Sequence, residues 1–252
     1  MLPTSAAAPP SGLTRRGSRS GSMFGTYFRR IIKPQQMDFE YTFWLMLQLC
    51  ISPKTAYRHT SYQKQTKNLW ARDDPAFVVV CCLLLAAASA AYCATFSRSL
   101  WHSMLSVLSA VVVDFLLIGL ATSSTCWFIA NRFLRKRNLP HHQVEQHVEW
   151  LYAFDVHCNS WFPLFLELYV LQFLLTPLLL LHAWLPSALA CVLYAAAFSH
   201  YHYLNFLGYS ALPFLERTEA LLWPVGAIVI ALPFALLLRF NPSRFVLSMY
   251  FS

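Results

Sequence analysis

Residues 75–97 read PAFVVVCCLLLAAASAAYCATFS and contain no charged side chain. A helix needs about 20 consecutive apolar residues to cross the hydrocarbon core of a bilayer, and this stretch is long enough. Asp74 and Pro75 favour a helix start there, because Asp accepts hydrogen bonds from free amide groups and Pro lacks one such group. The stretch therefore predicts a transmembrane helix.

The rest of the composition agrees with a membrane protein. Of the 252 residues, 57% are hydrophobic and only 12% are charged, whereas a soluble domain is about 25% charged. Further apolar runs lie downstream, and we expect an all-α integral membrane bundle of about five transmembrane helices. The spans are predicted at about 75–97, 103–130, 159–181, 185–207 and 220–238.

Two segments precede this bundle, which we place at 75–252. Residues 1–34 are rich in Ser, Ala, Pro, Gly and Arg, and are predicted to be a disordered basic arm. Residues 35–74 contain a 15-residue apolar stretch (37–51), too short to cross, followed by basic residues. It is predicted to be an amphipathic helix in the membrane interface; the alternative is a cytosolic helix packed against the bundle.

The net charge of +8 is distributed unevenly along the chain. Eleven of the 19 Lys and Arg residues precede residue 75, and four more lie within 132–137. Basic segments stay preferentially on the cytosolic side, so the N-terminus is predicted to be cytosolic. With five spans, the C-terminus is then lumenal.

Residues 149–163, EWLYAFDVHCNSWFP, bring together Asp155, His157, Cys158 and Asn159. On a helix, side chains three or four positions apart share a face, so Asp155 and His157 point in different directions and His157 is poorly placed to activate Cys158. We interpret the stretch as a polar collar at the cytosolic start of the third span, with Asp155 capping the helix. A partner- or lipid-binding pocket is the alternative, and catalysis is not expected.

Neither a metal nor a cofactor is predicted. The seven cysteines form no CxxC motif and suit small packing residues. A loop carries His141, His142, Glu145, His147 and Glu149, which could hold a metal, but an ordinary solvated loop is the preferred interpretation.

Three ionisable residues fall inside predicted spans: Asp114, Glu167 and His200. Each costs about 2.5–3.5 kcal/mol on insertion scales. Glu167 and His200 lie about seven residues from the cytosolic ends of their spans, at a shared depth of roughly 10 Å, so we expect them to face each other. A structural hydrogen bond is the favoured role, and a proton or ligand relay is the alternative.

Five separated strings carry a family resemblance: QMDFE (36–40), QKQTK (63–67), WARDDPAF (70–77), YAFDVH (152–157) and FLGYSALPFL (206–215). Together they resemble the Unc-fifty (uncoordinated-fifty homologue) family of multi-span Golgi membrane proteins. The GYSALP string is also similar, more weakly, to the Yip family of Rab-associated Golgi proteins. The resemblance covers about residues 35–250.

The resemblance implies a non-catalytic protein of the Golgi or early secretory pathway that supports vesicular transport. For relatives it implies surface delivery of nicotinic acetylcholine receptors and recruitment of Arf exchange factors; the Yip likeness adds Rab-type machinery. Some members are also placed at the inner nuclear membrane and described as RNA-binding. The basic N-terminal region could contact RNA phosphates, but it flanks the spans, and we prefer the anionic cytosolic leaflet as its partner.

We expect a contact surface for partners or lipids built from three segments, 63–74, 132–157 and 208–217. A small transporter or channel that uses Asp114 and Glu167 is the alternative function. The predicted contact residues are Lys64, Lys67, Trp70, Arg72, Asp73, Asp74, Asp155, His157, Asn159, Gly208, Tyr209 and Pro213.

Overall fold

The computed structural model describes residues 35, 37–67, 69–96, 99–136 and 146–251. These residues form helices and no strand, so the all-α prediction is confirmed. The predicted arm, 1–34, lies outside the described residues.

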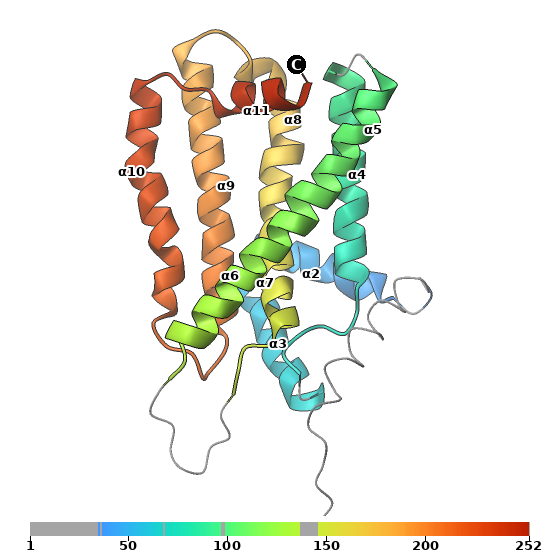
Figure 1. Ribbon diagram of the computed structural model, residues 1–252, viewed down its shortest axis with the longest axis vertical. Coiled ribbons are helices and arrows are strands. Elements are labelled where there is room, and N and C mark those ends of the chain that lie inside the picture. Colours follow the sequence, from blue (N-terminus) through green and yellow to red (C-terminus); the bar gives the residue numbers. More distant parts are fainter. Residues whose placement is uncertain (1–34, 36, 68, 97–98, 137–145, 252) are drawn as a thin grey trace, which may run out of the picture.

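Long helices run up and down the molecule and are joined at alternate ends (Figure 1). α4 (Ala76–Phe96) is followed by a continuous rod of α5 (Leu100–Ser109), η2 (Ala110–Leu117) and α6 (Ile118–Phe133). A second rod consists of α7 (Trp150–Phe165), η3 (Leu166–Leu171) and α8 (Gln172–Leu179). The chain then returns through α9 (Trp184–Ser210), η4 (Thr218–Leu222), α10 (Trp223–Leu237) and α11 (Pro242–Phe251).

Four of these stretches are long and apolar enough to cross a membrane: 76–96, 100–133, 150–179 and 218–237. α9 is also long enough, with 27 residues, but His200, His202 and Asn205 lower the mean hydropathy of its second half. It packs between α7 and α10 in the place of the remaining predicted span (Figure 1). The chain is a multi-pass membrane protein.

The third span differs most from its predicted bounds. Its helix begins at Trp150, nine residues before the expected position 159. The polar residues 155–159 suggested a membrane boundary, but in the structure they lie within the helix and are largely buried. Neighbouring elements supply their partners, and this allows the helix to continue through them.

Both rods contain a π-helical segment, which sequence reasoning did not predict. η2 carries Asp114, and η3 carries Glu167. A π-helix shifts hydrogen bonding to i→i+5, and such segments are frequent at functional sites. The two intramembrane carboxylates therefore both lie where the helix is locally wider.

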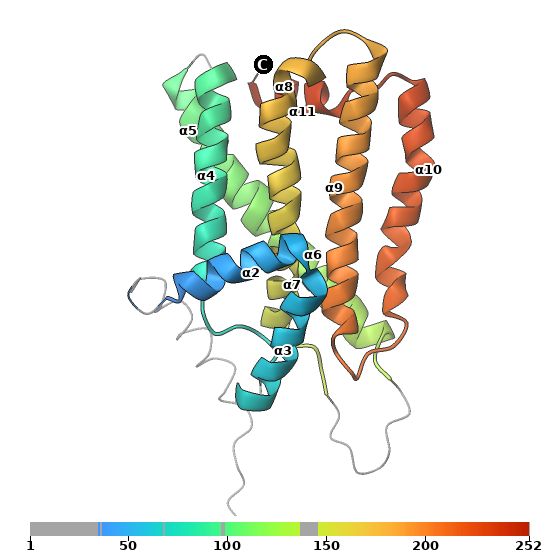
Figure 2. The ribbon, with the colours of Figure 1, turned by 180° about the vertical axis from the view of Figure 1, so that it is seen from behind.

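α2 (Phe39–Ile51) lies across one end of the bundle, and α3 (Pro53–Lys67) extends away from it (Figure 2). Leu45, Met46 and Leu49 of α2 are buried against the bundle, as the alternative interpretation required. The opposite face exposes the apolar side chains of Phe43, Leu47 and Ile51. This second face suits the membrane interface, so the helix combines features of both interpretations.

Candidate functional site

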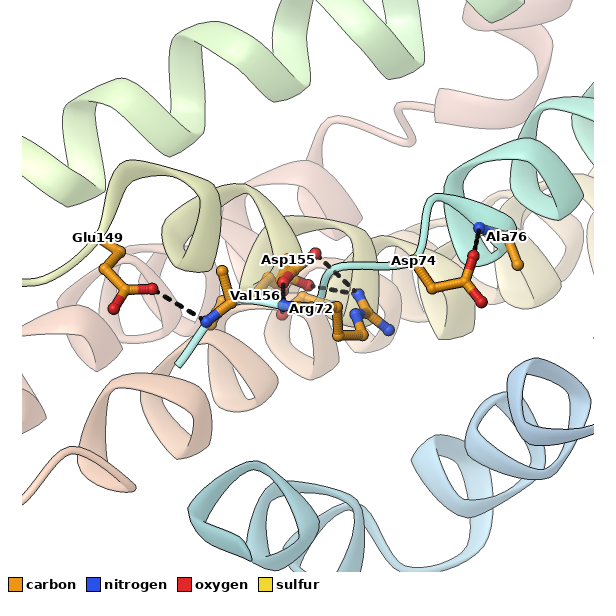
Figure 3. Close-up of polar contacts among 8 residues, drawn as sticks. Arg72, Asp74, Ala76, Glu149, Asp155 and Val156 are labelled. Atoms are coloured by element: carbon orange, nitrogen blue, oxygen red, sulfur yellow. Dashed lines mark hydrogen bonds and ion pairs between the residues drawn. The ribbon is translucent and has the colours of Figure 1, made fainter. Parts of the chain in front are cut away.

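The connector between α3 and α4, residues 69–75, lies along the first turns of α7 (Figure 3). The Glu149 carboxylate accepts hydrogen bonds from the backbone N–H of Trp70 at 3.3 Å and of Ala71 at 3.1 Å. Asp155 Oδ2 accepts from the Arg72 N–H at 2.6 Å. Two carboxylates, one just before α7 and one in its second turn, thus fix an irregular segment whose amides would otherwise lack partners.

The Arg72 side chain completes this arrangement. Its Nη2 lies 3.3 Å from Asp155 Oδ1, and the two side chains are only 11% and 6% exposed. The guanidinium also lies 4.4 Å from the ring centroid of Phe77. The sequence suggested that Asp155 caps its own helix. It does not, because α7 begins five residues earlier and the carboxylate faces the connector instead.

Asp74 links the beginnings of two helices. Its Oδ1 accepts from the N–H of Ala76 at 3.0 Å, which is the cap predicted for the first span, and its Oδ2 accepts from the N–H of Asp38 at 2.8 Å. Asp38 in turn accepts from the Tyr41 N–H and caps α2. This chain of caps fixes α2 against the start of α4.

The three predicted surface segments do meet. The short segments that follow α6 and α9 pair with each other through their backbones. The Lys136 N–H donates to the Phe214 C=O at 3.1 Å, and the Glu216 N–H donates to the Leu134 C=O at 2.7 Å. The Asn131 amide exchanges two hydrogen bonds with the backbone of Val148. The described parts of segments 132–157 and 208–217 therefore lie together with the connector at one end of the molecule.

Burial corrects the predicted contact set in part. Trp70, Asp155, Asn159, Gly208 and Tyr209 are buried and make contacts within the fold. His157 is also buried, but it lines a cavity within the bundle. The Arg72 side chain is largely buried, with 11% exposed. Asp73, Asp74 and Lys64 are half-buried, and Lys64 Nζ lies 5.6 Å from the Trp70 ring centroid. Pro213 is exposed, whereas the Lys67 side chain lies outside the described residues.

Gly208 and Tyr152 show why buried positions of this end tolerate little change. The Tyr152 hydroxyl donates to the Gly208 carbonyl at 2.6 Å. A Cβ on Gly208 would lie 2.7 Å from Val156 Cγ1 and 3.1 Å from Tyr57 Cε1. Only glycine allows α9 to approach α7 and α3 this closely.

His157 points away from Asp155, as the helical spacing predicted. Its Nδ1 lies 2.8 Å from the Tyr201 hydroxyl of α9, and its ring packs against Gly119 of α6. Cys158, next to it in sequence, is fully buried in the cluster that contains Cys81 and Phe162. The two side chains that looked reactive in the sequence occupy separate surroundings.

The predicted contact between Glu167 and His200 is present, with Oε1 and Nδ1 2.8 Å apart. Asp114 has partners that the sequence did not suggest: its Oδ2 accepts from Tyr169 at 3.4 Å and from Tyr250 at 2.5 Å. Asp114, Glu167 and His200 thus each have a hydrogen-bonding partner on another element, as costly intramembrane charges require.

Sequence reasoning also missed α11, which supplies Tyr250. Asn241 Oδ1 accepts from the Arg244 N–H at 3.0 Å, and Asn241 Nδ2 donates to the Leu179 carbonyl at 2.8 Å. The Arg244 guanidinium donates to the carbonyls of Leu180 and Leu181, which directly follow α8. The signal was the Asn-Pro pair at 241–242, because Asn suits an N-cap and Pro suits the first helical position.

In the described part of the chain, no three His, Cys, Asp or Glu side chains gather as a metal site. Three members of the alternative metal set, His141, His142 and Glu145, lie outside the described residues.

Comparison with known proteins gives one consistent result. The UNC-50 family matches residues 27–251 of the chain. A Dictyostelium discoideum protein named "Protein unc-50 homolog" is 44% identical over 247 residues, covering 96% of this chain and 94% of that protein. Proteins of the same name from Bos taurus and Homo sapiens are each 36% identical, and cover 99% and 89% of this chain and 98% and 85% of their own lengths.

No solved structure gives a significant match. The family match spans most of the chain, and it includes the strings that position the connector, α7 and the end of α9. The chain therefore belongs to the UNC-50 family.

Proposed function

We propose that this protein is a non-catalytic membrane protein of the Golgi and early secretory pathway that supports vesicular protein transport. In this proposal it recruits Arf exchange-factor or Rab-type machinery through a cytosolic face and aids surface delivery of membrane receptors. The observation that favours it most is the gathering of α3, the connector and the two paired loops at one end of the bundle (Figure 2). We call this the α3 end.

Charge supports a cytosolic position for the α3 end. Exposed basic side chains collect there, while the described charges at the opposite end are Arg239 and Arg244. Basic residues favour the cytosolic side, and each one near an anionic leaflet contributes about 1 kcal/mol. The exposed basic residues of the α3 end are Lys54, Arg58, Arg132, Lys136 and Arg217.

Rigidity also favours a docking role. The connector is fixed by Glu149 and Asp155, and Val148 is fixed by Asn131. Residues 134–136 are fixed by backbone pairing with 214–216. A surface already held in one conformation binds a partner without a large cost of ordering.

Proximity labelling from an N-terminal fusion tests the proposal in cells. We expect enrichment of coat, exchange-factor or Rab proteins, a reduced signal for K54E/R58E on α3, and no change for R239E at the opposite end. Microscopy must show the same Golgi location for all three. Failure to enrich any transport machinery, or an equal loss in R239E, would contradict the proposal.

A transporter or channel is the second candidate, because Asp114 lines a cavity within the bundle. It predicts that D114N changes a solute flux in proteoliposomes while localisation and proximity labelling remain normal. RNA binding would instead require recovery of crosslinked RNA that depends on the basic residues before residue 34.

A further inference from the structure

A cavity of about 510 Å³ lies in the middle of the bundle between the two rods, α4, α9 and α11. Its volume falls within the roughly 300–1,000 Å³ typical of sites for small molecules. The wall is mostly aromatic and apolar, and includes Tyr92, Trp161, Tyr169, Tyr194, Phe198 and Tyr201.

The cavity reaches the outer surface of the bundle between α6 and α9. Ile118 of α6 and Phe198 of α9 both line it, and both are also exposed, by 52% and 43%. These positions lie midway along their spans, and α6 crosses the bundle obliquely while α9 stands upright (Figure 1). A molecule entering here would come from the hydrocarbon core of the membrane.

Two polar atoms on the wall lack partners among the described residues. Gln172 and Ser89 are 3% and 6% exposed, and neither Gln172 Oε1 nor Ser89 Oγ has a hydrogen-bonding partner in the described part of the chain. Leaving such an atom unpaired costs about 1–3 kcal/mol. Gln172 Oε1 can only accept a hydrogen bond, so it would pair with a ligand that carries a hydrogen-bond donor, such as a hydroxyl.

The charge of the wall excludes one class of ligand. Asp114 lines the cavity, and among the described lining residues there is no Lys or Arg. A phosphate headgroup would therefore meet a carboxylate and no counter-charge. An uncharged ligand avoids this repulsion, and the aromatic wall gives it apolar contact.

We propose that this cavity binds a neutral membrane lipid whose polar group is a hydroxyl, entering from the bilayer between α6 and α9. Sterols and diacylglycerols share this chemistry. The hydroxyl donates to Gln172 Oε1, and the apolar body lies against the aromatic wall. Tyr250 of α11, bound to Asp114, closes the end of the site near the C-terminus.

The test uses the full chain purified in nanodiscs with three photoreactive probes: a sterol, a diacylglycerol and a phosphatidylcholine. After irradiation, labelled peptides are identified by mass spectrometry. We expect saturable labelling of cavity-lining peptides by a hydroxyl probe, competed by its unlabelled lipid, with little labelling by phosphatidylcholine. Comparison of the sterol and diacylglycerol arms identifies which source of the hydroxyl is bound.

Two variants and a matched control sharpen the result. I118W obstructs the mouth and should reduce labelling at least fivefold, whereas L120W should not. Leu120 lies on the same helix with a similar exposure of 45%, but does not line the cavity. Q172L keeps the size of the side chain, removes the acceptor, and should weaken competition by about fivefold.

Three results would overturn the proposal: equal labelling by phosphatidylcholine, labelling that does not saturate, or equal loss in I118W and L120W. If Q172L does not fold, the I118W and L120W pair still decides, because both side chains are exposed and neither is part of the packed core.

Discussion

Arg72 and Asp155 form an ion pair that is almost shielded from water, 83 positions apart in the chain. Their geometry serves the connector: the Asp155 carboxylate binds both the Arg72 backbone and its guanidinium. Asp74 and Glu149 likewise accept hydrogen bonds from backbone groups, and Gly208 allows two helices to pack closely. At the level of single residues, the polar side chains of the α3 end mainly position segments that have no regular structure.

Breaking the pair should be costly, because removing one partner leaves the other charge buried. We expect R72A or D155A to lower the free energy of unfolding by about 3–5 kcal/mol. The double variant R72M/D155L should lose less stability than either single variant, since neither charge is then left buried without its partner. Thermal unfolding of the purified protein in detergent measures this, with the exposed R58A as control; equal stability of R72A and R58A would contradict the interpretation.

Two glycines provide a second comparison. G208A places a Cβ 2.7 Å from Val156, and such overpacking costs about 1–3 kcal/mol. In G226A nothing lies within 4 Å of the added Cβ, and alanine is the better helix former by about 1 kcal/mol. Unfolding measurements should therefore move in opposite directions for the two variants, and a loss of stability in both would argue against the packing explanation.

Among the elements, α2 has two apolar faces with different surroundings. Thr42, Leu45, Met46 and Leu49 are buried against the bundle, and the stripe of Phe43, Leu47 and Ile51 is exposed. An apolar stripe at i, i+4, i+8 facing outward, beside the exposed basic residues of α3, is the arrangement expected at a membrane interface. We therefore expect α2 to lie in the membrane interface while it packs against the bundle.

Spin labelling can locate this stripe. With the native cysteines replaced, a nitroxide at L47C should be relaxed by dissolved oxygen, which concentrates in the bilayer. A nitroxide at K54C, one residue into α3, should be relaxed by a water-soluble nickel complex instead. If the label at position 47 behaves like the one at 54, α2 does not lie in the interface.

At the scale of the whole molecule, the two ends of the bundle differ in charge and construction. The α3 end carries paired loops, α3 and most described basic residues, while the other end carries short turns and α11 (Figures 1 and 2). α11 is fastened there by Asn241, Arg244 and by His102, whose Nε2 lies 2.7 Å from the Tyr250 carbonyl.

This asymmetry predicts the orientation in the membrane. Since basic residues remain cytosolic, an N-terminal epitope should be accessible to antibody after selective permeabilisation of the plasma membrane. A C-terminal epitope should become accessible only after the internal membranes are opened. The reverse order, or simultaneous access to both, would contradict a cytosolic α3 end.

The sequence alone determined the long apolar spans and their membrane environment. The hydrocarbon core has a fixed thickness and requires every backbone group to bond within its own helix. The length of an apolar stretch therefore predicts a span without any knowledge of the neighbouring helices. It also determined the Glu167–His200 contact, because equal depth in neighbouring spans restricts partners to one level. Only the tertiary structure decided where α7 begins, that Asp155 binds Arg72, that Asp114 binds Tyr250 136 positions away, and that a cavity lies between α6 and α9. Those features depend on which helices pack together, and a local pattern of residues does not predict that packing.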